Sequence, residues 1–212
     1  MRKLFSFMVT TLDGYHVGPN GEFDWPNVDG EFHEFSIRQL NDIDTLLFGR
    51  ITYEDMAQFW PTPEAQDTDP VTARRMNSLH KLVFSSTLTE ATWENSELVT
   101  TDPVARIDEL KQRPGDGDLA LFGSSTLTAS LLEAGVVDEL RVMVNPVLLG
   151  SGVSLFGALT DRFEVRLLRT VTFRNGNVLL CYAPATHERA GPATADEGTD
   201  RRARAAGGEL RR

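Results

Sequence analysis

Short apolar segments, each followed by a segment with helical periodicity, recur along the chain, and this alternation is the feature that most limits its fold. The apolar segments are residues 4–9, 45–48, 81–84, 119–122 and 139–144. The helical candidates between them are residues 31–41, 53–59, 72–79, 102–111 and 124–134. Because parallel strands need crossover connections, this pattern predicts a mostly parallel sheet with helices on both faces.

The last apolar segments depart from this alternation. Residues 163–173 and 178–183 flank the pair Asn175-Gly176. An Asn-Gly pair between two apolar segments is a strong hairpin signal. We therefore expect an α/β fold with a mostly parallel central sheet and an antiparallel C-terminal hairpin.

The composition of the chain changes at residue 187. Residues 1–186 carry the apolar segments and are expected to form one folded domain, whereas residues 187–212 contain six arginines, five acidic residues and only one large aliphatic residue, Leu210. Such a segment buries too little apolar surface to offset its ordering entropy, so a disordered charged tail is predicted. A basic docking arm around Arg201, Arg202 and Arg204 is the alternative.

Charge and cysteine content exclude several function classes. A formal net charge of −10 disfavours nucleic acid, which is bound mainly through cations. No apolar stretch approaches 18 residues, so no membrane span is expected. The single cysteine, Cys181, excludes an internal disulfide framework, and the four histidines lack metal-ligand spacing, so no metal is expected. The first residues resemble a strand and not a signal peptide, so a cytoplasmic protein is expected.

A glycine directly follows the second apolar segment. Gly49 would let a ligand approach the backbone, and the helix after it would present free N–H groups to an anion. Arg50 adds a guanidinium suited to phosphate, and Thr52 is expected to cap the helix. A capped helix with a surface arginine is the alternative.

Two more strand ends carry hydroxyl groups. Ser85 and Ser86 follow the third apolar segment, and Gly123, Ser124 and Ser125 follow the fourth. Serine turns are common, so each motif alone has a purely structural explanation. However, the carboxyl ends of parallel strands share one edge of a sheet, where ligands of such folds bind. Three such motifs at one edge favour a long polyphosphate ligand.

The order of these motifs resembles a known family. The segments that carry the resemblance are residues 11–14, 47–54, 83–86, 121–140 and 146–156. Together they resemble the dihydrofolate reductase-like superfamily, and within it the C-terminal reductase domain of the bacterial riboflavin-biosynthesis deaminase/reductase and its stand-alone relatives. The resemblance covers about residues 3–184; its strength lies in the joint order of the motifs.

The resemblance implies an NADPH-dependent oxidoreductase that acts on a small molecule and forms a homodimer. It would transfer a hydride to a small polar heterocyclic or ribosylated substrate, as a 5-amino-6-(5-phosphoribosylamino)uracil reductase does. The implied cofactor-binding residues are Gly49, Arg50, Thr52, Ser85, Ser86, Gly123, Ser124 and Ser125. In this resemblance Ser85 and Ser86 contact the 2′-phosphate. Many relatives have two adjacent glycines where this chain has Gly123-Ser124.

The resemblance also suggests residues for the chemistry. Asp13 occupies the position of an aspartate that would orient the substrate or relay a proton; its alternative is a turn former. Glu34 is the candidate for the helix carboxylate that protonates the substrate in dihydrofolate reductases; its alternative is a solvated helix glutamate.

Loop residues complete the expected substrate pocket. Phe23 and Trp25 would form its wall, and Gly150 and Gly152 its rim. Three other functions remain open at this point, namely genuine dihydrofolate reduction, a non-catalytic module that binds NADPH without turnover, and an interaction scaffold formed by the acidic body of the chain.

Overall fold

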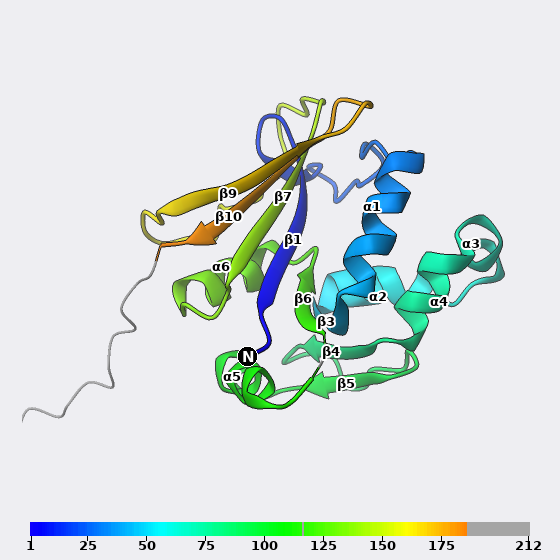
Figure 1. The fold of residues 1–212 in the computed structure, drawn as a ribbon, viewed down its shortest axis with the longest axis vertical. Coiled ribbons are helices and arrows are strands. Elements are labelled where there is room, and N and C mark those ends of the chain that lie inside the picture. Colours follow the sequence, from blue (N-terminus) through cyan, green and yellow to red (C-terminus); the bar gives the residue numbers. More distant parts are fainter. Residues whose placement is uncertain (116, 186–212) are drawn as a thin grey trace, which may run out of the picture.

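The computed structural model describes residues 1–115 and 117–185, and its centre is a mixed eight-stranded sheet (Figure 1). The strands of this sheet are β1 (Leu4–Thr11), β3 (Ile43–Gly49), β4 (His80–Phe84), β5 (Ser96–Val99), β6 (Asp118–Phe122), β7 (Glu139–Asn145), β9 (Val165–Thr172) and β10 (Val178–Pro184). Their spatial order is β5-β4-β3-β6-β1-β7-β10-β9. A small second sheet pairs β2 (Tyr15–Val17) with β8 (Val153–Ser154). The predicted tail, residues 187–212, lies outside the described residues.

Six neighbouring strands of the large sheet run parallel. They extend from β5 to β7, with β1 paired to both β6 and β7. The last two strands form the predicted antiparallel hairpin, in which β10 pairs with β7 and β9. In the turn of this hairpin, Gly176 N donates a hydrogen bond to Phe173 O at 3.0 Å, and Gly176 has a φ of 92°. The Asn-Gly pair thus lies in a short turn that needs a glycine at this position.

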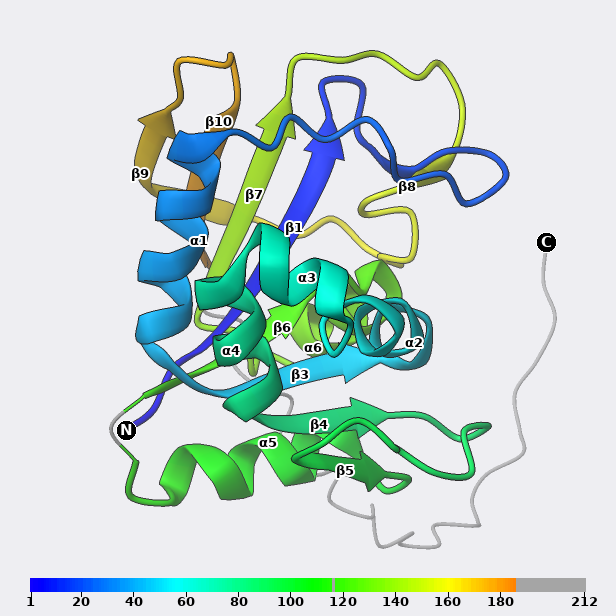
Figure 2. The same cartoon turned by 90° about the vertical axis from the view of Figure 1, so that its right-hand side faces the viewer.

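Helices cover both faces of the sheet, as predicted (Figure 2). They are α1 (Gly30–Asn41), α2 (Arg50–Phe59), α3 (Pro63–Thr68), α4 (Pro70–Ser78), α5 (Pro103–Gln112) and α6 (Ser125–Glu133). Residues from α1, α2 and α4 pack with Phe48 and Val83 on one face, whereas residues from α5 and α6 pack with Leu47 and Leu82 on the other. Adjacent strand residues serve opposite faces because side chains alternate along a strand. No helix in the described ranges is long and apolar enough to cross a membrane.

The starts and ends of two helices follow their sequence signals. Asp102 caps α5 by accepting a hydrogen bond from Val104 N, and Pro103 is the first helical residue. Ser124 caps α6. Gly135 follows the end of α6 with a φ of 67°, a conformation that favours glycine.

A buried lysine, Lys81, lies near the amino end of β4. The Lys81 side chain is fully buried, and its Nζ donates to the carbonyl oxygens of Asn77 (3.0 Å), Leu79 (2.8 Å) and Glu94 (2.9 Å). The same atom lies 4.3 Å from the ring centroid of Trp93. Burial lowers the pKa of Lys81 to about 8.

Lys81 therefore predicts a specific dependence of stability on pH. Its pKa is 10.5 without burial and about 8 in the fold, so between these values the unfolded chain binds more protons than the native state. The free energy of unfolding of the wild type, relative to that of Lys81→Met, should rise by roughly 1–3 kcal/mol as the pH increases through this window. Urea unfolding across the window measures it. A difference that stays flat or falls with pH contradicts the prediction.

Candidate functional site

Two parallel strands bring glycines together at the carboxyl edge of the sheet. A Cβ atom built on Gly49, at the end of β3, would lie 2.6 Å from Ser124 Oγ. A Cβ on Gly123, just after β6, would lie 2.7 Å from Thr52 Cγ2, and Gly123 has a φ of +69°. We call Gly49, Thr52, Gly123 and Ser124 the glycine cradle. It joins the starts of α2 and α6, so the structure brings together residues that the sequence placed at separate strand ends.

The cradle contains the N-termini of two helices. Gly49 is the N-cap of α2 and makes no side-chain capping bond, whereas Ser124 Oγ accepts from Leu127 N at 3.4 Å at the start of α6. The prediction that Thr52 caps α2 is wrong, because α2 begins at Arg50 and Thr52 lies inside its first turn. Helix N-termini carry partial positive charge, so two of them at one point form an anion-binding arrangement.

Polar groups at the neighbouring strand end extend the cradle. Gly49 lies opposite Phe84 in the β3–β4 register, so Ser85 and Ser86 follow directly beside it. Ser85 Oγ accepts from Leu88 N at 2.9 Å and from Thr87 N at 3.1 Å, which is the turn geometry of the structural alternative. Ser86 is exposed.

Arg50 lies at the first position of α2. One guanidinium nitrogen, Nη1, donates to Glu54 Oε2 at 2.8 Å across one helical turn. The side chain is partly exposed, so a ligand at the cradle can compete for it. Ser125, the first residue of α6, is buried.

Asp13, beyond the end of β1, binds the loop that follows β7. Its Oδ2 accepts from Gly150 N at 2.8 Å, and its Oδ1 accepts from Thr11 Oγ1 at 2.6 Å and from Leu149 N at 3.3 Å. The Thr11 hydroxyl and the Gly150 N–H hold the pKa of Asp13 below its usual value. A carboxylate held ionised by three donors is suited to orienting this loop and poorly suited to donating a proton at neutral pH.

The two expected rim glycines have different surroundings. A Cβ on Gly152 would lie 2.3 Å from Val17 O, so only glycine permits the close approach of this loop to β2. Gly150 has a φ of +73° and open space around it. Gly152 is thus required by packing, and Gly150 presents its backbone to Asp13.

The aromatic pair lies on the loop between β2 and α1. The rings of Phe23 and Trp25 are 5.4 Å apart in an edge-to-face arrangement, and Phe23 is 53% exposed. The loop is tied to the end of β7 by Asn27 N, which donates to Asn145 Oδ1 at 2.8 Å. Asn177 Nδ2 donates to Asn27 O at 2.9 Å. Sequence reasoning missed these asparagines, since nothing in their local context distinguishes them.

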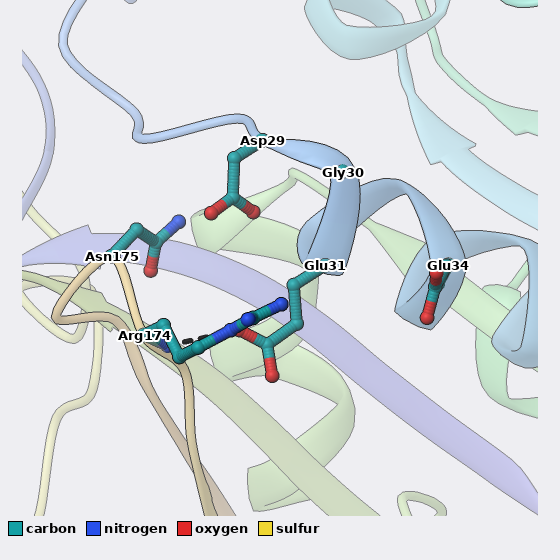
Figure 3. A pocket seen from close by; sticks show the side chains of 6 residues that line it. All are labelled: Asp29, Gly30, Glu31, Glu34, Arg174 and Asn175. Carbon is teal, nitrogen blue, oxygen red and sulfur yellow. Dashed lines mark hydrogen bonds and ion pairs between the residues drawn. The ribbon is translucent and has the colours of Figure 1, made fainter.

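Glu34 lies on the solvent side of α1. Its side chain is 74% exposed and lies 3.6 Å from Arg38, one turn along the helix. It also borders an open depression of about 580 Å³, where it points away from Arg174 and Asn175 (Figure 3). This is the geometry of the solvated-glutamate alternative, and the structure gives no support for a buried proton donor at this position.

Within residues 1–115 and 117–185, no three His, Cys, Asp or Glu side chains are grouped in a way that could hold a metal ion.

Comparisons with known proteins identify relatives along nearly the whole body of the chain. The family model of the RibD C-terminal domain matches residues 2–179. The uncharacterized protein YyaP of Bacillus subtilis is 34% identical over 184 residues, which are 85% of this chain and 94% of that protein.

Solved structures share the fold. A protein from Shewanella sp. PV-4 assigned to riboflavin biosynthesis matches with a TM-score of 0.67 and 24% identity over 87% of this chain and 99% of its own. The deaminase/5-amino-6-(5-phosphoribosylamino)uracil reductase of Thermotoga maritima matches with a TM-score of 0.60 and 16% identity, over 87% of this chain and 57% of its own. Dihydrofolate reductase of Enterococcus faecalis, complexed with NADP(H), matches with a TM-score of 0.56 and 17% identity, over 87% of this chain and 97% of its own. The dihydrofolate reductase-like fold is therefore confirmed.

The contacts of the glycine cradle predict a steric coupling. Gly123→Ala should destabilise the fold by roughly 2–4 kcal/mol, because it adds a left-handed backbone cost to a clash with Thr52. In the Gly123→Ala background, Thr52→Ser removes the methyl group that clashes, so the double variant should regain part of the lost free energy of unfolding. Gly21→Ala is the matched control, since Gly21 has a φ of +86° and nothing within 4 Å of its Cβ position. Urea unfolding of the variants measures the coupling; equal losses for Gly123→Ala and Gly21→Ala contradict it.

Proposed function

The chain belongs to the RibD C-terminal domain family, and we propose that it is an NADPH-dependent reductase of the riboflavin-biosynthesis type, which transfers a hydride to a small polar heterocyclic or ribosylated substrate. The observation that carries the proposal is the glycine cradle, where two helices begin at adjacent strand ends. The names of the T. maritima reductase and of the NADP(H) complex of E. faecalis dihydrofolate reductase support it.

The cradle fits the pyrophosphate of a dinucleotide. Cβ atoms on Gly49 and Gly123 would clash with the side chains of Ser124 and Thr52, so the glycines let the two helix starts lie close together. The N-terminal N–H groups of both helices can then bind one anion. In this proposal the first turns of α2 and α6, with Ser124 and Ser125, bind the pyrophosphate, and Arg50 and Thr52 extend the contact. Ser85 and Ser86 bind the 2′-phosphate that distinguishes NADPH from NADH.

The protein would supply position and environment. The nicotinamide ring supplies the hydride when the cofactor is bound. Asp13 holds the loop around Gly150 against the end of β1, which fixes the substrate side of the site. Phe23 and Trp25 would form the wall of the substrate pocket and limit the entry of water.

Two alternatives remain distinct from this proposal. Dihydrofolate reduction loses support because Glu34 is exposed and paired with Arg38. A non-catalytic NADPH-binding module would keep the cradle without turnover. The homodimer implied by the family resemblance stays a prediction; β9 offers an exposed edge strand with apolar residues for it.

The proposed cofactor contacts predict selective losses of affinity. Arg50→Ala should weaken NADPH binding about tenfold, because a charge-assisted hydrogen bond to phosphate is lost. Arg38→Ala is the matched control, since both arginines are exposed partners of a glutamate one helical turn away. Ser85→Ala should weaken NADPH more than NADH. Calorimetry measures these affinities, and failure of the wild type to bind either nucleotide removes the proposal.

Substitution of Asp13 is expected to affect turnover and cofactor affinity differently. Asp13→Asn should lower turnover about tenfold or more, because the loop around Gly150 loses a charged acceptor and the substrate is held less accurately. The NADPH dissociation constant should change less than twofold. Steady-state kinetics and calorimetry on the same preparation test both statements. Binding of NADPH by a wild type without turnover would favour the non-catalytic module.

A further inference from the structure

The two faces of β10 differ sharply in how well they are covered. On the α1 side, Leu179 and Cys181 are buried in a core cluster that also packs against Phe35 of α1. On the other side of the same strand, Leu180 and Tyr182 are only half-buried. β10 lies between β7 and β9, so these side chains are exposed because their face of the sheet lacks cover and not because the strand is an edge.

The cover on this side of the sheet ends at β7. Residues of α5 and α6 pack with β3, β4 and β6. The next cluster joins Val142 of β7 to Leu155 and Phe156, which follow β8, and it contains no helix residue from the described ranges. No core cluster of the described residues reaches Leu180 or β9. β9 forms the outer edge of the sheet, at the left of Figure 1.

The uncovered side chains of β9 and β10 form one surface. Directly paired residues of antiparallel strands share a face, and Thr170 is paired with Leu180, Thr172 with Val178 and Leu167 with Tyr182. We call these six residues the hairpin face. Leu167 is 50% exposed, and both threonines are exposed.

The hairpin face carries no charge, although the chain as a whole has a formal net charge of −10. β9 does contain two arginines. Arg169 is paired with Cys181 and Arg166 with Ala183, so both lie on the α1 side of the sheet. Arg169 there lies 3.0 Å from Glu139. An exposed apolar patch from which charges are kept away is typical of a surface that contacts another protein.

The chemistry of this face favours a second copy of the chain as its partner. Residues 187–212 contain one large aliphatic residue, Leu210, and so offer little apolar surface to cover it. A twofold axis brings a surface against itself, which requires that no like charges meet there. The hairpin face meets this condition, whereas a strongly acidic or basic partner would find no counter-charge on it.

We propose that the hairpin face is the interface of a twofold homodimer in which the β9–β10 surfaces of two copies pack face to face. The three strands from β7 to β9, each of seven or eight residues, have a flat footprint of about 25 Å by 14 Å. Side chains that stand out of this plane raise its accessible area towards the ~500 Å² per partner that a specific interface needs. The proposal concerns assembly alone, so it is independent of the proposed cofactor and reaction.

The mass of the full-length protein in solution tests the proposal first. Size-exclusion chromatography with light scattering, at protein concentrations from about 1 to 100 µM, should show a dimer that dissociates only at the low end. A monomer throughout this range overturns the proposal. A trimer or a larger assembly also overturns it, because a twofold interface closes at two copies.

Charge variants on β9 test which surface forms the contact. Leu167→Glu and Thr170→Glu should each weaken dimerisation at least tenfold, because each places a carboxylate inside an apolar contact. Val171→Glu is the matched control, since Val171 is on the same strand and 40% exposed but is paired with Leu179 on the α1 side. It should change the dissociation constant less than threefold, and circular dichroism checks that each variant is folded. Equal losses in Leu167→Glu and Val171→Glu overturn the assignment, and so does an unweakened dimer in Leu167→Glu.

The salt dependence of the wild type gives a second test that needs no variant. Between about 0.1 and 1 M NaCl, an apolar contact between two acidic copies should stay as tight or become tighter, because salt screens their mutual repulsion. Analytical ultracentrifugation at both salt concentrations measures the dissociation constant. A dimer that weakens tenfold or more in 1 M NaCl is held by ion pairs, and this result overturns the proposal.

Discussion

The close approach of two strand ends at the glycine cradle is the constraint on which the rest of the site depends. β3 and β6 are neighbours in register, with Leu47 opposite Leu121, so the chain beyond each strand turns into its helix at nearly the same place. A Cβ on Gly49 or Gly123 would collide with Ser124 or Thr52. Glycine therefore lets both helices begin at one point, and their combined N–H groups create the anion-binding character from which the proposed cofactor site follows.

The sequence predicted the architecture because the buried parallel strands are largely apolar segments, and β3, β4 and β6 are each separated from the next long strand by a helical pattern. Elements without that pattern were missed. β5 has two polar residues among four, β2 and β8 have three and two residues, and α3 has six, so none shows a measurable period. The start of α2 was also misplaced, because Gly49 ends the strand and begins the helix through its backbone, without a capping side chain.

The candidate site was predictable in its parts but not in their contacts. The strand-end rule led to Asp13, Gly49, Ser85 and Gly123 because each follows an apolar segment. The partners of Asp13, however, lie 136 and 137 residues along the chain, and Asn145 lies 118 residues from Asn27. Such contacts depend on the order of strands in the sheet, which local sequence does not specify.

Mapping of backbone amide resonances during an NADPH titration tests the central claim most directly, because it reports where the cofactor binds without relying on a substrate. A cofactor held by the glycine cradle should shift the amides of Gly49, Arg50 and residues 123–125 most strongly, with smaller shifts at Ser85 and Ser86. The resonances of the amides around Lys81, near the amino end of β4, should stay unchanged. Shifts concentrated away from residues 49–52 and 123–125, or no shifts at saturating NADPH, would contradict the assignment of the cradle as a dinucleotide site.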